Sequence, residues 1–185
     1  MKELVTRILP EIEEIRDERL REQVIACWTE AMLFRGWSEE LLKSIPFTLL
    51  SEHVKISFLD HVRSVCRICM AVEDELRRSH GADTIPINRD VLLAGALLAD
   101  IGKLYEYEIR DLQVVESEYG GQLRHPFSGV GLAFKHELPP EVMHVIATHS
   151  KEGREERRSP EAVIFHHADF INLELATRSA AIRTR

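Results

Sequence analysis

Two aspartates lie in strongly apolar stretches of the sequence. Asp100 directly follows Val91–Ala99, a run without a polar side chain, and Asp169 lies in the middle of the apolar segment 163–175. Burying a carboxylate without a partner costs several kcal/mol. A divalent cation would stabilise both carboxylates, because it is a larger local charge than any side chain. The alternative is two ion pairs within the core, one between Asp100 and Lys103 and one between Asp169 and a histidine.

Histidines near these aspartates favour the metal interpretation. The chain has nine histidines, and four occupy informative positions: His61, His125, His149 and His166. Any one of them alone is more typical of a hydrogen-bonded core residue. Together with two carboxylates, however, imidazoles form a ligand set suited to Mn, Fe, Mg, Zn or Ni. We therefore predict a site for one or two divalent ions.

These residues occur in a fixed order of short segments. The segments are His61 in a long predicted helix, Asp100-Ile101-Gly102-Lys103, Arg124-His125-Pro126, Ala147-Thr148-His149 and His166-His167-Ala168-Asp169. The order resembles that of the HD superfamily of metal-dependent phosphohydrolases, over roughly residues 53–172. The resemblance implies that His61, Asp100 and Asp169 hold a primary metal. It also implies that Asp100 bridges to a second metal held by His125 and His149.

The resemblance also implies roles beside the metal. Asp100 and Lys103 would be the catalytic residues, with Lys103 neutralising a phosphate oxygen of the substrate. Arg154, in the charged loop 151–158, is a candidate contact for substrate phosphates, although a solvated loop is the simpler interpretation. His53 is a candidate extra ligand. His166 either orients the last metal-site aspartate or belongs to the core.

Ala99 is a departure from the family pattern, because this position normally holds a ligand histidine. A methyl group cannot coordinate a metal, so the substitution predicts weaker metal binding and weak or absent activity. The chain is either a naturally degenerate member or a His-to-Ala variant of an active enzyme. The implied function is hydrolysis of a nucleotide or another small phosphate ester by a metal-activated water. The alternative is a catalytically inactive metal- or nucleotide-binding HD protein.

Helices must position these residues. We predict an all-α, HD-type bundle of about six to eight helices with the metal between them. The expected helices cover residues 11–34, 38–43, 54–78, 88–101 and 159–177, with two more opening at Pro126 and at Pro139-Pro140. A small β-hairpin could use Val114-Val115 and a turn at Gly120-Gly121. We expect one structural domain, with N-terminal helices in 1–50, the metal-binding core in 51–177 and a frayed tail in 178–185.

Composition excludes several other classes. The chain has 185 residues and a formal net charge of −7, which disfavours nucleic acid as the main partner. No apolar stretch approaches the roughly 20 residues of a membrane span. The N-terminus lacks a signal-peptide pattern and the cysteine count is odd, so we expect a cytoplasmic protein. Cys66-x-x-Cys69 has no second pair and is interpreted as core. The expected partner is a small phosphorylated substrate, and a homo-oligomer is left open.

Overall fold

The all-α prediction is confirmed by the computed structural model, which describes residues 1–49, 54, 56–153 and 157–183. Within these residues the only sheet is a two-stranded hairpin. The elements are, in order, α1 (Lys2–Ile8), η1 (Pro10–Glu14), α2 (Glu18–Arg35), α3 (Glu39–Ser44), α4 (Phe58–His80), α5 (Arg89–Leu98), α6 (Lys103–Glu106), β1 (Tyr107–Arg110), β2 (Gln113–Glu116), α7 (Glu118–Gln122), α8 (His125–Lys135), α9 (Pro140–Thr148), η2 (Lys151–Gly153) and α10 (Pro160–Arg183). None of the described helices is both long and apolar enough to cross a membrane.

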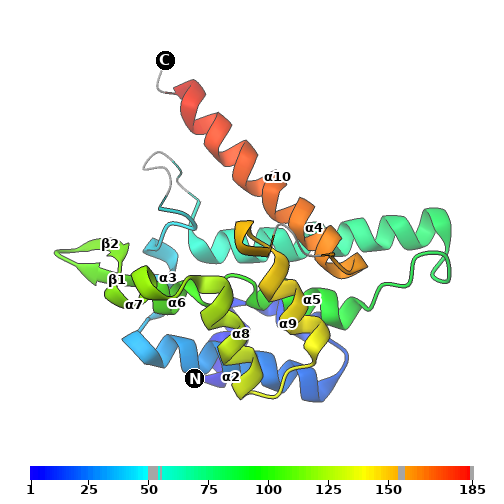
Figure 1. The fold of residues 1–185 in the computed structure, drawn as a ribbon, viewed down its shortest axis with the longest axis horizontal. Coiled ribbons are helices and arrows are strands. Elements are labelled where there is room, and N and C mark those ends of the chain that lie inside the picture. Colours follow the sequence, from blue (N-terminus) through cyan, green and yellow to red (C-terminus); the bar gives the residue numbers. More distant parts are fainter. Residues whose placement is uncertain (50–53, 55, 154–156, 184–185) are drawn as a thin grey trace.

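Helix α5 is the centre of the bundle. Every residue from Val91 to Leu98 is buried, as the absence of polar side chains predicts. It packs against α2, α4, α9 and α10, which surround it in Figure 1. The indole of Trp28 donates a 3.1 Å hydrogen bond to the carbonyl of Leu97. This bond satisfies one of the carbonyls that the end of α5 leaves without a helical partner.

The first predicted helix is divided in the structure. Residues 11–34 do not form one helix, because the chain leaves η1 at Ile15 and enters α2 only at Glu18. The carboxylate of Asp90 accepts hydrogen bonds from the backbone N–H groups of Arg16, at 3.1 Å, and Asp17, at 2.9 Å. The side chain of Asp17 then caps α2. The break is thus stabilised by a residue far away in the sequence.

The predicted hairpin exists, but its turn lies elsewhere. Val114 and Val115 are in β2 as expected, whereas the turn consists of Asp111 and Leu112, with φ values of 52° and 64°. Gly120 and its neighbour belong instead to α7. A Cβ atom on Gly120 would lie only 2.5 Å from the carbonyl oxygen of Glu106. This glycine therefore permits close packing of α7 on α6.

The last helix is longer than predicted. Helix α10 continues to Arg183, past the expected end near Thr177 and into the expected frayed tail. In Figure 1 its C-terminal half extends away from the bundle, while its N-terminal half packs against α4, α5 and α9. The packed half contains Asp169, so α10 brings this aspartate to the centre of the molecule.

Candidate metal centre

A cavity of about 340 Å³ opens beside the C-terminal end of α5. Its polar lining includes Asp100, Lys103, Glu106, Arg124, His125 and His149. Asp100 lies in the turn that follows α5, His125 begins α8, and His149 ends α9. Three separate helix ends therefore deliver polar side chains to one buried space.

Three acceptor atoms converge in this cavity. The Nε2 atoms of His125 and His149 are 3.3 Å apart. They lie 3.5 Å and 3.6 Å, respectively, from Oδ1 of Asp100. Two ligands bound to one ion at about 2.1 Å are separated by roughly 3.0–3.4 Å in tetrahedral or octahedral geometry. The three atoms are therefore spaced as ligands of a single cation.

The partners of the other ring nitrogens favour the tautomer in which the converging atoms carry lone pairs. Nδ1 of His125 lies 2.8 Å from a carboxylate oxygen of Glu106. Nδ1 of His149 lies 2.7 Å from the carbonyl oxygen of Ile146. Both partners are acceptors, so each Nδ1 carries a hydrogen, and in its neutral form each ring then directs the lone pair of Nε2 inward. When both rings are neutral, two lone pairs and a carboxylate at this spacing repel one another, and a cation between them would relieve the repulsion.

A second group of donors shares Asp100. Nε2 of His61, on α4, lies 3.3 Å from Oδ2 of Asp100 and 3.0 Å from Oδ1 of Asp169. The ring of His61 stacks on Phe47, with centroids 4.5 Å apart. Its Nδ1 is buried and has no hydrogen-bond partner among the residues that the structure describes. The three donors could hold a second ion.

Lys103 neutralises part of this charge. Its Nζ donates to Oδ2 of Asp100 at 2.9 Å and to the carbonyl oxygen of Phe47 at 2.7 Å. The ion pair between Asp100 and Lys103 thus exists together with the convergent donors. Burial alone would lower the pKa of Lys103, but the charge and hydrogen bond of Asp100, together with the charges of Tyr107 and Asp169, outweigh burial and raise the pKa. The ammonium group therefore remains protonated at neutral pH.

The buried groups shift one another's pKa values. Burial alone would raise the pKa of Asp100, but the charge of Lys103 and hydrogen bonds from His149 and His61 hold it well below its usual value. Burial would lower the pKa of His149 and His61, yet their contacts with Asp100 raise both. Burial dominates at His125, whose pKa is lowered. Asp100 is therefore an ionised carboxylate, as a metal ligand must be.

A family model for the HD domain matches residues 58–171, more than half of the chain. This chain belongs to the HD-domain family. It is also 30% identical to a dihydroneopterin 2',3'-cyclic phosphate phosphodiesterase of Methanocaldococcus jannaschii, over 97% of this chain and 74% of that protein. No solved structure matches the chain significantly. The resemblance inferred from the sequence is confirmed, and with it the general class of metal-dependent phosphohydrolases.

The HD-domain fold brings the five predicted metal ligands together. They form the two overlapping groups described above, Asp100 with His125 and His149, and His61 with Asp100 and Asp169. Two other predicted site residues, His53 and Arg154, lie outside the described residues. Ala99 is fully buried at the end of α5, immediately before the shared aspartate.

A role for His166 in orienting Asp169 would require a bond between the two side chains. The partner of His166 is a different one. Its Nδ1 lies 3.1 Å from the carbonyl oxygen of His149. Its ring packs on Phe170, with centroids 4.4 Å apart. Because α10 contacts the end of α9 through this bond, His166 helps to hold the two helices together. This agrees with the interpretation of His166 as a core residue.

Sequence reasoning missed Glu106 and treated Arg124 only as part of a motif. Glu106 is buried in the four-residue helix α6 and bonds to His125, and both Glu106 and Arg124 line the cavity. A carboxylate between the buried residues Tyr105 and Tyr107 is the signal that could have identified Glu106. It is the same argument that singled out Asp100, applied to a shorter apolar segment.

Proposed function

We propose that this HD-domain protein hydrolyses a small phosphate ester with a divalent cation held by Asp100, His125 and His149. The observation that carries the proposal is the convergence of two imidazole nitrogens and a carboxylate oxygen at 3.3–3.6 Å. A bound cation would polarise a phosphoryl oxygen and lower the pKa of a water. His61 and Asp169, which share Asp100, would hold a second ion.

Two cationic side chains would bind the phosphate. Lys103 lines the cavity, and its third N–H is not used by the two acceptors already described. Arg124 lines the same cavity nearer its rim and is half-exposed. These two charges and a cation would bind a phosphate despite the acidic net charge of the chain. Lys103 would stabilise the negative charge that develops on the equatorial oxygens.

The apolar wall of the cavity favours an organic group with a flat ring. The apolar part of the lining includes Phe47, Tyr107, Phe170 and Leu173. Aromatic and aliphatic walls suit a heterocycle, with polar groups fixing its orientation. The relative acts on dihydroneopterin 2',3'-cyclic phosphate. We therefore propose a nucleotide or a comparable heterocyclic phosphate ester, including cyclic phosphodiesters, as substrate.

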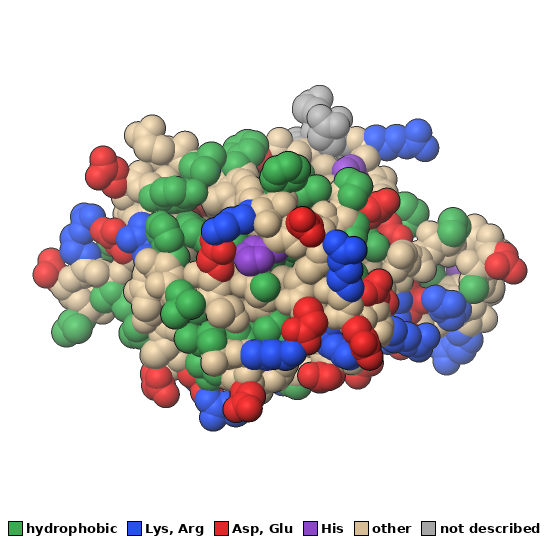
Figure 2. All heavy atoms as spheres, turned by 90° about the horizontal axis from the view of Figure 1, so that it is seen from below, with side chains coloured by type: hydrophobic (Ala, Val, Ile, Leu, Met, Phe, Trp, Pro, Cys, Tyr) green, Lys and Arg blue, Asp and Glu red, His purple; other side chains and the backbone are tan. Residues whose placement is uncertain are grey.

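A long nucleic acid fits the surface less well. On the face that Figure 2 shows, the acidic and basic side chains of the described residues are interspersed, without a continuous basic band. A phosphate backbone needs several clustered cations to replace its counterions. The expected partner is therefore a small molecule.

The second candidate is a protein that binds metal or a nucleotide without hydrolysing it. Ala99 favours this alternative, because the family normally places a ligand histidine there. Only the first candidate predicts turnover, whereas the second predicts binding of a cation or a nucleotide alone. An assay of turnover in cation-loaded protein therefore separates them.

The experiment loads the purified protein with Mn²⁺, Fe²⁺ or Zn²⁺ and measures phosphate-ester hydrolysis. The substrates are 2',3'- and 3',5'-cyclic nucleotides, mononucleotides and a single-stranded oligonucleotide. We expect cation-dependent hydrolysis of a small ester that Asp100→Asn abolishes. Asp83→Asn, at an exposed position on another part of the chain, is the matched control and should behave like the wild type. Cation binding without hydrolysis of any substrate would support the inactive alternative, and absence of both would refute the proposal.

A further inference from the structure

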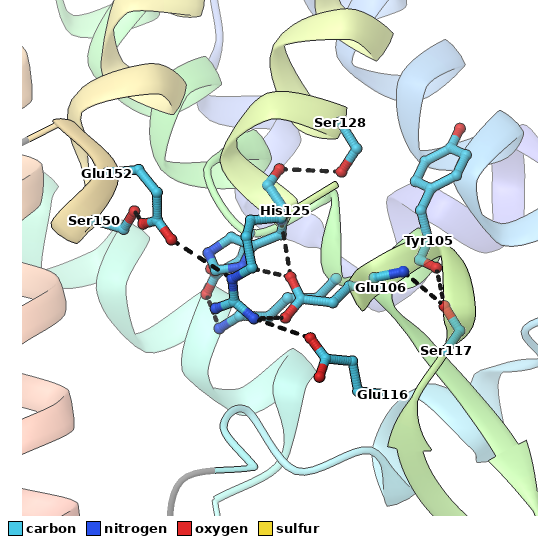
Figure 3. Close-up of polar contacts among 12 residues, drawn as sticks. Tyr105, Glu106, Glu116, Ser117, His125, Ser128, Ser150 and Glu152 are labelled. Atoms are coloured by element: carbon cyan, nitrogen blue, oxygen red, sulfur yellow. Dashed lines mark hydrogen bonds and ion pairs between the residues drawn. The ribbon is translucent and has the colours of Figure 1, made fainter. Parts of the chain in front are cut away.

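We propose that Glu106 is the positioning residue for His125, which it holds in the tautomer that directs the lone pair of Nε2 into the metal centre. This inference rests on the proposed function. It adds a carboxylate to the site that the ligand pattern itself does not contain. In Figure 3 Glu106 points toward His125, and its carboxylate also accepts a hydrogen bond from Arg124.

The carboxylate of Glu106 is fully engaged by donors. One oxygen accepts hydrogen bonds from both the backbone N–H and Nδ1 of His125, each at 2.8 Å. The other oxygen is bonded by Nη1 of Arg124. Only 3% of the residue is exposed. A buried carboxylate held by two donors from one histidine fixes the position and the orientation of that ring.

The backbone around Glu106 is fixed from the other side by α7. Ser117 donates its backbone N–H to the carbonyl oxygen of Glu106 at 2.8 Å and its hydroxyl to the carbonyl oxygen of Tyr105 at 3.1 Å. Gly120 packs so closely that an added Cβ would lie 2.8 Å from Cγ of Glu106. The side chain therefore has little freedom to turn away from His125.

The partner of His125 differs from those of the other two histidines. His149 donates to the carbonyl oxygen of Ile146, a neutral acceptor. Nδ1 of His61 lacks a partner among the described residues. A carboxylate acceptor makes an imidazole a more basic ligand than a carbonyl does. His125 is thus the histidine whose ligand strength depends on another side chain.

The experiment compares Glu106→Ala and Glu106→Gln with the wild type. The first readout is the tautomer of His125 in metal-free protein, measured by ¹⁵N NMR of the imidazole ring. We expect the wild type and Glu106→Gln to keep the hydrogen on Nδ1, because the amide oxygen can still accept it. In Glu106→Ala we expect the hydrogen to move to Nε2 or to be distributed between the two nitrogens.

The second readout is Zn²⁺ affinity, measured by calorimetry with a competing chelator. We expect Glu106→Ala to bind about 10- to 100-fold more weakly than the wild type, as is usual when a partner of a metal ligand is lost. Glu106→Gln should fall between the two, because a neutral amide polarises the ring less. Glu30→Gln is the matched control, since Glu30 also bonds a histidine, Nε2 of His136 at 3.0 Å, outside the cavity. It should bind Zn²⁺ like the wild type.

The outcomes are distinguishable. Unchanged tautomer and affinity in folded Glu106→Ala would overturn the role of Glu106 while leaving the proposed function intact. If Glu106→Ala does not fold, the affinity of Glu106→Gln decides, and a value equal to that of Glu30→Gln overturns the inference. If the wild type itself binds no cation, the proposed function fails. The tautomer of His125 in metal-free protein then still tests whether Glu106 sets it.

Discussion

Gly102, two residues after the shared aspartate, is a position at which a single added methyl group should perturb the metal centre strongly. Its φ of −62° and ψ of −17° are ordinary for any residue, so the requirement for glycine is not conformational. It is spatial instead. An ideal Cβ would lie 2.1 Å from the carbonyl oxygen of His125 and 2.5 Å from the hydroxyl oxygen of Ser128. Gly102→Ala therefore pushes directly on the start of α8, where His125 lies.

The size of the effect follows from these distances. Ordinary contacts begin near 3.4 Å, so the backbone oxygen of His125 must move by more than 1 Å or the carbon must be displaced instead. Backbone cannot rotate away as a side chain can. Inserting atoms into a packed core typically costs about 1–3 kcal/mol, and we expect the upper end, ~3 kcal/mol of unfolding free energy. For a chain of this length that lowers the Tm by roughly 6–12 °C.

The assay is urea and thermal unfolding in excess EDTA, so that cation binding does not contribute. The matched control is Gly131→Ala on α8, the helix that Gly102→Ala pushes against, where an added Cβ would meet nothing within 4 Å. This variant should stabilise the protein by about 0.5–1 kcal/mol, because alanine suits a helix interior better than glycine. If Gly102→Ala unfolds at the same urea concentration as the wild type, the turn at Gly102 and the start of α8 do not approach this closely, and the reasoning is refuted.

Three further predictions concern the cation and the thiols. Ala99→His should raise both Mn²⁺ occupancy and phosphate-ester turnover, because it supplies the ligand that the family normally has. If a folded variant shows only background Mn²⁺ occupancy and background turnover, the proposed metal site is contradicted. The thiols should not react with Ellman's reagent in native protein at pH 8 but should all react in denaturant. Burial raises the pKa of Cys27 and Cys69 to about 12 and that of Cys66 well above its usual value, so the reactive thiolates are absent. A cation present at 100 times its Kd should raise the unfolding free energy by about 2.7 kcal/mol, and a thermal transition that EDTA leaves unchanged would contradict binding.

The sequence was most informative where apolar residues recur on one helix face over several turns. The apolar spacing on α4 and the uninterrupted apolar run of α5 predicted both helices closely, with Asn88 and Gly81 at their ends. The break before α2 could not be predicted from apolar spacing, because its stabilising partner, Asp90, is more than 70 residues away in the sequence. The turn at Leu112 was also hidden, since a leucine at positive φ is uncommon and carries no sequence signal.

The candidate site could be predicted to a similar extent. Ligand types and their order are local information, so the five histidines and aspartates were identified before the structure placed them together. The partners of those ligands are not local. Glu106 meets His125 across 19 residues through a four-residue helix, and α7 fixes it by a contact that depends on Gly120. Such contacts arise from tertiary packing and leave no periodic pattern in the chain.

The two groups of donors differ in how well they are prepared for a cation. Each group keeps three donors, and both include Asp100, so their number does not distinguish them. The hydrogen-bond partners of their imidazole rings distinguish the two groups. His125 and His149 are both held in one tautomer by an acceptor at Nδ1, whereas Nδ1 of His61 has no such partner within the described part of the chain. A ligand that is already oriented loses less entropy when an ion binds. The group containing His125 and His149 is therefore the better prepared of the two for a cation.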